Sequence, residues 1–281
     1  MAEILKGAPV AAAIDKRSEE LLRRLKELGT EPALAIVRVG EKDSDLSYER
    51  SAMKKCLAVG VKIKNIVLPE DISEKDYLDR LNELNEDKDV HGILLLRPLP
   101  KSIDDDKARE TLLPSKDVDG CTAGSLAGVM SGEEMGFAPC TAQAITEILD
   151  HYGIDCSGKR VAVVGRSLVV GRPVSLMLLH KNATVTICHT KTENMAEITK
   201  NSDIVILCAG RMETFGAEYF SADTAVIDAG IAFNEIKGKL CGDCIFEEVE
   251  PVVSAITPVP GGVGAVTSSV LINHVLQAAW R

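Results

Sequence analysis

The chain has 281 residues, which is enough for two domains, and 46% of them are hydrophobic, which is enough to fill the core of each. A formal net charge of −10, the lack of a concentrated basic run and an aromatic content of only 4% argue against nucleic acid as a partner. No apolar run reaches membrane-spanning length and the N-terminus lacks a signal-peptide pattern, so we expect a cytoplasmic protein with no membrane partner.

Helices and strands are predicted to alternate through the first half of the chain. Apolar residues at helical spacing indicate helices over residues 8–28, 44–59 and 75–85. Apolar and β-branched runs indicate strands over residues 33–39, 61–68 and 90–96. This alternation is typical of an α/β domain with a parallel sheet. The link to the second half is predicted to hold a short helix over 107–113, a turn-rich segment over 114–120 and a helix over 142–152.

The segment 159–173 around which the second half is arranged has the pattern of a phosphate-binding turn. Four apolar residues, 161–164, suit a strand buried on both faces of a parallel sheet. Gly165 ends this strand, and Pro173 suits the first turn of the helix that follows. A strand, a tight turn and a helix N-terminus together present backbone N–H groups and a positive dipole end to a phosphate.

This turn departs from the usual Gly-x-Gly-x-x-Gly fingerprint of dinucleotide sites. Ser167 replaces the middle glycine, and Gly171 falls one place late. Taken alone, the pattern fits an ordinary strand–helix turn about as well as a cofactor site. A second strand predicted over 183–188 follows after one helix length, as a βαβ unit requires, and favours the cofactor site.

The end of this second strand indicates which dinucleotide binds. Sites that prefer NAD normally carry Asp or Glu here to bind the ribose 2′-hydroxyl. This chain has His189, Thr190 and Lys191 instead, with Arg166 in the preceding turn. Because the carboxylate is missing and cations replace it, a 2′-phosphate would be stabilised, and we expect NADP in preference to NAD.

The rest of the second half contains further predicted elements and a loop rich in proline and glycine. Strands are predicted over 203–207 and 225–228, with a hairpin over 231–240 and a closing helix that ends near Trp280. The loop Pro258–Gly264 is so rich in proline and glycine that a close backbone approach to a ligand is favoured over a plain linker.

Cys241 and Cys244 form the one suggestive pair among eight cysteines. A zinc site would need two further ligands at suitable spacing, and none is evident nearby. A redox pair would normally lie where a strand enters a helix, whereas this pair falls in a predicted turn region. We therefore expect structural or incidental thiols, and no metal site.

Three residues of the first half could contribute to catalysis or binding. Tyr48 lies on the helix over 44–59, near the expected carboxyl ends of the strands, and suits either ligand stacking or interfacial packing. Lys55 follows two helical turns later on the same face, where a solvated surface charge is the simpler interpretation. Asp119 precedes Gly120 and fits either an Asp-Gly turn or a carboxylate that binds the N–H donors of a heterocycle.

Taken together, the motifs closely resemble the bifunctional methylenetetrahydrofolate dehydrogenase/methenyltetrahydrofolate cyclohydrolase family. The resemblance covers almost the whole chain and is carried by Tyr48 in its helix and by residues 92–100 (GILLLRPLP), 116–120 (KDVDG), 139–141 (PCT), 165–173 (GRSLVVGRP) and 256–264 (ITPVPGGVG). It implies a homodimeric, cytoplasmic enzyme of one-carbon metabolism and purine biosynthesis. It also implies a folate-binding catalytic α/β domain over 1–139, completed by a C-terminal helix over 263–281, and a Rossmann-like NADP-binding domain over 140–262.

The same resemblance implies roles for individual residues. Tyr48 would stack on the aminobenzoyl part of the folate and Asp119 would bind the pterin, both as catalytic residues with Lys55 as a further candidate. Arg166 and Thr190 would hold the NADP 2′-phosphate, and Ser167 would contact the cofactor phosphates. The remaining substrate-binding residues would be Leu95, Leu96, Pro260 and Gly261. The remaining cofactor-binding residues would be Thr141, Gly165, Gly171, His189, Gly210, Gly230, Ile231 and Thr267, with Ile231 near the nicotinamide.

Two positions depart from the family pattern. Ala52 stands where the family has its catalytic lysine, and Leu96 stands where it has a glutamine. Hydride transfer from the methylene bridge needs orientation above all, whereas hydrolysis of the methenyl bridge needs a general acid/base. We therefore expect a competent dehydrogenase whose cyclohydrolase step is weakened, lost or carried by another group such as Lys55.

Two other functions are open to this sequence. One is a different two-domain dehydrogenase, such as one that acts on a shikimate-like acid; the loops at Asp119 and Pro260 argue against it. The other is a folate- or nucleotide-binding protein without turnover; the intact cofactor motif argues against it.

Overall fold

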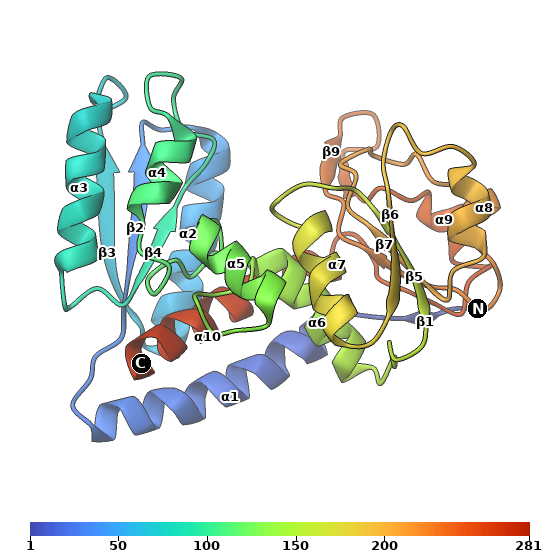
Figure 1. The fold of residues 1–281 in the computed structure, drawn as a ribbon, viewed down its shortest axis with the longest axis horizontal. Coiled ribbons are helices and arrows are strands. Elements are labelled where there is room, and N and C mark those ends of the chain that lie inside the picture. Colours follow the sequence, from blue (N-terminus) through green and yellow to red (C-terminus); the bar gives the residue numbers. More distant parts are fainter. The chain divides into compact units, whose positions relative to one another are not determined.

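The computed structural model describes residues 1–281, apart from the side chains at positions 43–45, 47 and 48. The chain forms two compact units (Figure 1). The first, here called the three-strand unit, comprises residues 13–140 and 268–281. The second, here called the six-strand unit, comprises residues 1–12 and 141–267.

The sheet of the three-strand unit is parallel throughout, in the order β3-β2-β4. Its strands are β2 (Ala33–Val39), β3 (Lys62–Leu68) and β4 (Gly92–Leu95), joined by α2 (Asp43–Val59) and α3 (Glu74–Glu86). Central β2 is paired on both sides, and all seven of its residues are buried. The strands and helices expected from hydrophobic spacing in this half are therefore present, as is the parallel α/β fold.

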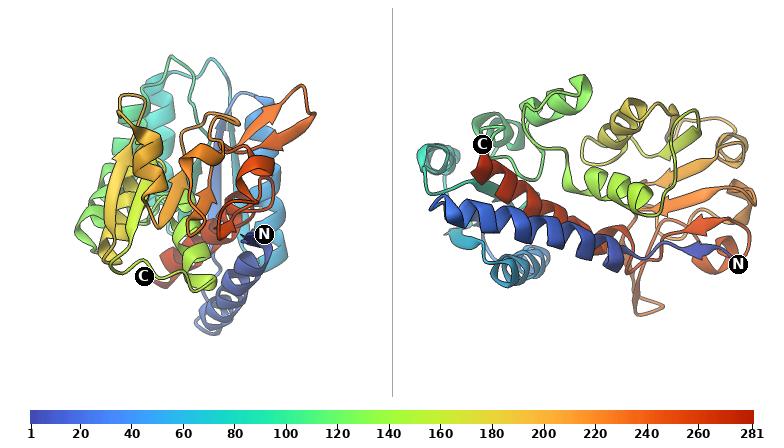
Figure 2. Two further views of the ribbon diagram at one scale, coloured as in Figure 1. Left: turned by 90° about the vertical axis from the view of Figure 1, so that its right-hand side faces the viewer. Right: turned by 90° about the horizontal axis from the view of Figure 1, so that it is seen from below.

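The two faces of this sheet have different partners. Ala35, Val37 and Val39 share a core with Tyr77 of α3 and Leu112, next to α4 (Asp105–Thr111). Because side chains alternate along a strand, the β2 residues between these three point to the other face. There, Arg38 binds Glu49 of α2. Part of α1 (Gly7–Glu27) and α10 (Thr267–Trp280) complete the unit and run side by side (Figure 2), joined by Asn273 and Ser18 at 3.1 Å.

Helix α5 (Ala123–Ser131) was not expected from the sequence. Thr122 caps it by accepting the N–H of Ser125. Its two glycines let other segments approach: a Cβ on Gly124 would lie 2.4 Å from Pro114, and one on Gly128 would lie 2.8 Å from the Glu133 carbonyl. Glycine lowers helix propensity, so neither spacing nor composition indicated a helix here.

The sheet of the six-strand unit is also parallel, in the order β1-β11-β8-β7-β5-β6. The strands are β1 (Glu3–Ile4), β5 (Arg160–Val164), β6 (Thr184–Cys188), β7 (Ile204–Leu207), β8 (Ala225–Asp228) and β11 (Ala255–Ile256). Its helices are α6 (Cys140–His151), α7 (Gly171–His180), α8 (Met195–Lys200) and α9 (Phe246–Val249), with short 3₁₀ turns η1 (Ala217–Tyr219) and η2 (Val263–Ala265). The strand order reverses between β5 and β7, which makes their carboxyl ends the switch point where such sheets bind ligands.

The six-strand unit includes residues 1–12, which were expected in the other domain. Glu3 and Ile4 pair with Ala255 and Ile256, and the N–H of Leu5 donates to Ile256 at 2.9 Å. Residues 1–12 therefore pack with this unit, although the sequence placed them in the first domain. A two-residue strand is too short for hydrophobic periodicity to indicate.

The predicted hairpin is formed by β9 (Ala232–Asn234) and β10 (Lys239–Cys241), which pair antiparallel. It projects from the rest of its unit (Figure 2, left). Cys241 ends β10 and, like Cys244, is buried and free. Among the described residues, no group of three or more His, Cys, Asp or Glu is placed to hold a metal ion.

None of the helices in the described residues combines the length and the apolar character that crossing a membrane requires.

Candidate functional site

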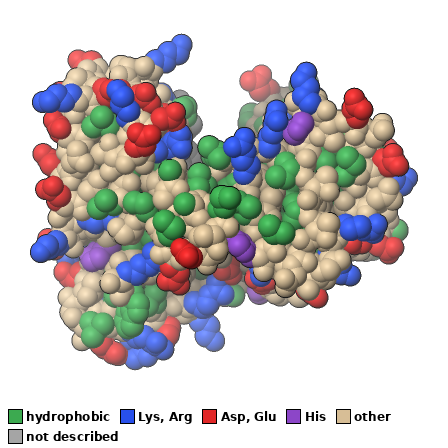
Figure 3. Space-filling view, in the orientation of Figure 1, with side chains coloured by type: hydrophobic (Ala, Val, Ile, Leu, Met, Phe, Trp, Pro, Cys, Tyr) green, Lys and Arg blue, Asp and Glu red, His purple; other side chains and the backbone are tan. Residues whose placement is uncertain are grey.

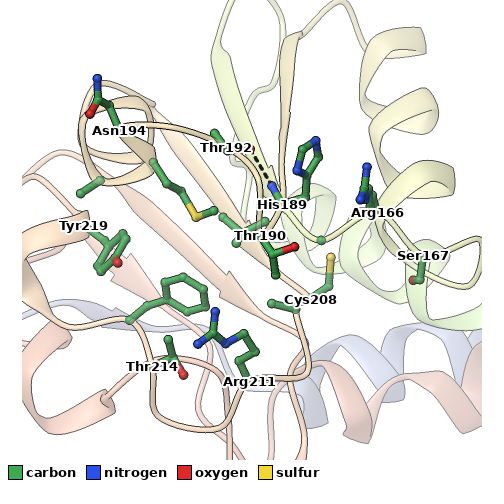
Figure 4. A pocket seen from close by; sticks show the side chains of 16 residues that line it. Arg166, Ser167, His189, Thr190, Thr192, Asn194, Cys208, Arg211, Thr214 and Tyr219 are labelled. Atoms are coloured by element: carbon green, nitrogen blue, oxygen red, sulfur yellow. Dashed lines mark hydrogen bonds between the residues drawn. The ribbon is translucent and has the colours of Figure 1, made fainter.

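A cavity of about 600 Å³ lies at the switch point of the six-strand unit (Figure 4). Three segments line it: the turn Gly165–Ser167 after β5, residues between His189 and Ala196 after β6, and residues between Cys208 and Tyr219 after β7. Five of the expected cofactor residues meet here or border it, namely Gly165, Arg166, Ser167, His189 and Thr190.

The glycine turn after β5 is as tight as a phosphate site requires. Gly165 has φ +139°, and a Cβ there would lie 2.4 Å from the Cys208 carbonyl at the end of the neighbouring strand. A Cβ on Gly171 would lie 2.3 Å from the Gly165 carbonyl. The late second glycine is thus explained, because it is where the start of α7 passes over the turn. No side chain caps α7 at Val170. The N–H of Arg172 donates to the Ser167 carbonyl at 3.0 Å and Pro173 has no N–H, which leaves the N–H of Gly171 to an anion.

The segment after β6 is held by its own hydrogen bonds. The backbone N–H of His189 donates to the Thr192 hydroxyl at 2.8 Å (Figure 4) and Nδ1 of His189 accepts the N–H of Lys191 at 3.1 Å. Thr190 is exposed at the cavity rim. This segment contains no acidic residue at the strand end, as the sequence indicated.

Two arginines from different segments line this cavity. Arg166 extends from the turn after β5 and Arg211 from the segment after β7 (Figure 4). Both are exposed, and neither forms an ion pair with a described residue. A group of basic side chains next to a histidine is visible on one edge of this unit (Figure 3). Unpaired guanidinium groups around a cavity are suited to a phosphate.

Sequence reasoning missed the residues contributed by the segment after β7. They are Cys208, Ala209, Arg211, Thr214, Phe215 and Tyr219. Arg211 could have been found, because it follows the strand that borders β5 at the switch point. Phe215 and Tyr219, whose ring centroids are 5.1 Å apart, had no local signal.

Six other expected cofactor residues do not line this cavity, namely Gly171, described above, and five more. Gly210 lies beside it in the turn after β7, with φ +63°. Gly230 and Ile231 follow β8, where Ile231 is 61% exposed. Thr141 is in the first turn of α6 and Thr267 begins α10.

The residues expected to bind folate fall in both units. Leu95 and Leu96 are buried at the end of β4, and the N–H of Leu96 donates to Val37 at 2.9 Å. Pro260 and Gly261 are exposed in the six-strand unit, where Gly261 has φ +102° and its carbonyl accepts the N–H of Gly7 at 2.8 Å.

Helix α2, which carries Tyr48 and Ala52, is anchored by a buried ion pair. The Glu49 carboxylate accepts hydrogen bonds from Nε of Arg38 and from Nδ2 of Asn65, both at 2.6 Å. Ala52, on the next turn, is 2% exposed. The Tyr48 side chain lies outside the described residues, so the expectation that it stacks on the folate stays a prediction.

Lys55 is engaged elsewhere on α2. Its Nζ lies 2.5 Å from Oδ2 of Asp15 on α1, and both side chains are partly buried. This pairing weighs against Lys55 as a free acid or base.

Asp119, which is half-buried, lies in the loop between α4 and α5. The loop is held by Asp117, whose carboxylate accepts the N–H groups of Cys121 and Thr122 at 3.0 and 2.7 Å. Burial raises the pKa of Asp119 to about 6; the nearby Asp117 adds to the rise and the Cys140 thiol opposes it. A carboxyl with this pKa can bind donors when ionised and exchange a proton near neutral pH.

Two family models cover nearly the whole chain. The model described as "Tetrahydrofolate dehydrogenase/cyclohydrolase, catalytic domain" matches residues 5–119. The model described as "Tetrahydrofolate dehydrogenase/cyclohydrolase, NAD(P)-binding domain" matches residues 139–281.

Individual proteins are similar over the same length. A relative from Clostridioides difficile named bifunctional protein FolD is 46% identical over 279 residues, 98% of this chain and 96% of the relative. The crystal structure of a bifunctional FolD methylenetetrahydrofolate dehydrogenase/cyclohydrolase from Campylobacter jejuni has a TM-score of 0.96 at 37% identity, covering 100% of this chain and 99% of the other. A FolD structure from Trypanosoma brucei, complexed with NADP and an inhibitor, has a TM-score of 0.92 at 32% identity, with coverage of 100% and 98%.

Proposed function

The chain belongs to the tetrahydrofolate dehydrogenase/cyclohydrolase family, and from this we infer that it is an NADP-dependent methylenetetrahydrofolate dehydrogenase that also hydrolyses the methenyl product. The observation that carries the cofactor assignment is the cavity at the switch point. There, Arg166 and Arg211 form no ion pair with a described residue, and the end of β6 carries His189, Thr190 and Lys191 in place of a carboxylate. This donor set fits a dinucleotide that carries a 2′-phosphate.

The chain's own residues bind and orient the reactants in the dehydrogenase step. NADP supplies the nicotinamide ring that accepts the hydride. We propose that the glycine turn and the Gly171 N–H at the start of α7 hold the diphosphate, and that Arg166 and Thr190 hold the 2′-phosphate. The cation left on the folate is stabilised by its own nitrogens, so the step needs alignment and little proton transfer.

The cyclohydrolase step makes a different demand, because water must be activated and a ring nitrogen protonated. Ala52 and Leu96 supply no titratable group, and Lys55 is bound to Asp15. Of the expected catalytic residues whose side chains are described, Asp119 is the one with a pKa suited to proton exchange near neutral pH. We propose that hydrolysis in this chain depends on Asp119 and is slower for want of a lysine at position 52.

An assay with both nicotinamide cofactors tests the dehydrogenase function. Purified protein with methylenetetrahydrofolate is expected to form NADPH from NADP, with a lower KM for NADP than for NAD. A protein that turns over a shikimate-like acid but not methylenetetrahydrofolate would be the other two-domain dehydrogenase considered above. A protein that binds both ligands without forming NADPH would have no turnover.

The pH dependence of the folate step tests the role of Asp119. Because the pKa of this carboxyl is raised to about 6, it is protonated below that pH and ionised above it. If the ionised form binds the pterin N–H donors, kcat/KM for methylenetetrahydrofolate rises through pH 6 and then levels. Asp119→Asn is expected to remove this step and lower kcat/KM about tenfold to a hundredfold, the equivalent of the ~1.5–3 kcal/mol of a hydrogen bond to a charged group.

The control for this variant is its affinity for NADPH, which is expected to stay at the wild-type value. A step at pH 6 that persists in Asp119→Asn would assign the titration to another group and contradict the proposal.

We also propose that the enzyme is a homodimer that uses the β9–β10 hairpin. Ile236 at its tip is 97% exposed, Phe233 is 60% exposed, and Leu240 is exposed as well. A projecting apolar hairpin is typical of a protein–protein contact. Light scattering is expected to give a dimer for the wild type and a monomer for Ile236→Lys with Phe233→Lys; an unchanged mass would place the interface elsewhere. A cytoplasmic location and a role in supplying one-carbon units, including those for purine biosynthesis, are part of the same proposal.

A further inference from the structure

A buried carboxylate organises the cavity wall that follows β7. Asp243, 1% exposed, accepts three consecutive backbone N–H groups at residues 209–211, with N···O distances of 2.6, 3.1 and 2.7 Å. Its own carbonyl accepts the N–H groups of residues 214 and 215 at 2.8 and 3.1 Å. One residue thus receives five hydrogen bonds from the segment that carries Arg211, Thr214 and Phe215 into the cavity.

A second buried carboxylate holds the first in place. Asp228, the last residue of β8, is also 1% exposed. It accepts the N–H groups of Gly230, Asp243 and Cys244 at 2.9, 3.1 and 2.9 Å. Burial raises the pKa of the Asp228 carboxyl to about 6, although the hydrogen bonds from Cys244 and Asp243 oppose the rise. The carboxyl is therefore ionised above about pH 6. The contacts form a chain from β8 through Asp243 to the cavity wall.

The backbone around both carboxylates leaves no room for other side chains. A Cβ on Gly242 would lie 2.2 Å from Oδ2 of Asp228, and a Cβ on Gly230 would lie 2.4 Å from Oδ1 of Asp243. Two adjacent acidic groups are costly to bury, and a well-packed apolar pair is often as stable. The arrangement does what an apolar pair cannot, since it fixes six N–H groups of two turns in one geometry.

We propose that Asp243 is a positioning residue for cofactor binding, because it fixes the backbone of residues 209–215, including that of Arg211. Asp228 in turn holds Asp243 in place. The inference rests on the proposed function, because it takes the cavity to be the NADP site. The two carboxylates hold the cavity wall in its final conformation before the cofactor is present, so that NADP does not have to order this segment as it binds.

A pair of asparagine variants separates this role from general stability. Asp243→Asn replaces one acceptor oxygen by a donor that faces an N–H. Asp203→Asn is the matched control: Asp203 accepts the Arg160 backbone N–H at 2.8 Å and its guanidinium at 3.0 Å, just before β7 and away from the cavity-lining residues. The probes are NADPH and 2′,5′-ADP, measured by calorimetry, together with steady-state kinetics.

Asp243→Asn is expected to weaken the binding of both probes by about tenfold, as the loss of one or two buried hydrogen bonds implies. KM for NADP should rise by a similar factor, while kcat at saturating NADP and KM for the folate change by less than about twofold. Asp203→Asn is expected to bind both probes as the wild type does. Wild-type affinity in Asp243→Asn, or an equal loss in Asp203→Asn, would overturn the inference. Failure of the wild type to bind NADPH would instead overturn the proposed function.

Amide hydrogen exchange on the wild type gives a second test that needs no variant. The amides at 209–211 and at 214 and 215 are expected to be protected before any cofactor is added. Exchange at the rate of an open loop, with protection only after NADPH binds, would show that the cofactor orders the wall and would also overturn the inference.

Discussion

Replacing Arg166 by glutamine is expected to raise KM for NADP about tenfold to a hundredfold, the equivalent of the ~1.5–3 kcal/mol of a hydrogen bond to a charged group. Arg166 borders the cavity from the turn after β5 and has no ion-pair partner among the described residues. Since the 2′-phosphate is the part that distinguishes NADP from NAD, KM for NAD should change by less than about threefold. Steady-state kinetics with each cofactor measures both values.

Arg160→Gln is the matched control for this variant. It makes the same change of charge in the same unit, at the opposite end of β5, where Arg160 pairs with Asp203 at 3.0 Å. It is expected to leave both KM values unchanged. If Arg166→Gln weakened NADP and NAD equally, Arg166 would bind a group common to both cofactors, and the assignment of the 2′-phosphate to it would be wrong.

Introducing lysine at position 52 is expected to accelerate methenyl hydrolysis by about tenfold or more, at the lower end of the range for general acid–base catalysis because the lysine is placed in an unadapted site. The dehydrogenase rate should stay within about twofold of the wild type, because that step needs orientation and not a proton carrier. Loss of methenyltetrahydrofolate absorbance without cofactor measures the first rate, and NADPH formation measures the second.

The surroundings of Ala52 decide how this experiment is controlled. Ala52 and Leu96 are 2% and 5% exposed, so a longer side chain at position 52 must displace neighbours, at a cost of about 1–3 kcal/mol. Ala52→Met has a similar length without the amine and should show the same change in Tm without the gain in hydrolysis. Adding Leu96→Gln should increase the gain. No gain in either lysine variant would mean that the missing lysine does not limit hydrolysis.

The fold was predictable wherever an element was long and regularly patterned. Strand β2 is buried along its whole length because it pairs on both sides, and its sequence is a continuous apolar run apart from Arg38. The short elements β11, α8 and α9 were not predicted, because a strand of two residues and helices of six and four residues are too short to show a period.

The cofactor site was predictable only where its residues are close in sequence. The glycine turn after β5 and the cations after β6 are local patterns, and the structure places both at the cavity. Asp243 is more than thirty residues from the three amides that its carboxylate binds, and no spacing rule connects them. Lys55 shows the converse, since its helix position was clear but its partner Asp15, forty residues earlier, was not.

Transfer of an isotopic label tests the central claim most directly. Methylenetetrahydrofolate with a deuterated methylene bridge is incubated with the enzyme and NADP, and the reduced cofactor is analysed by mass spectrometry. Direct hydride transfer predicts one deuterium in each NADPH formed, with no exchange into water. NADPH that carries hydrogen from solvent, or no NADPH at all, would contradict the account.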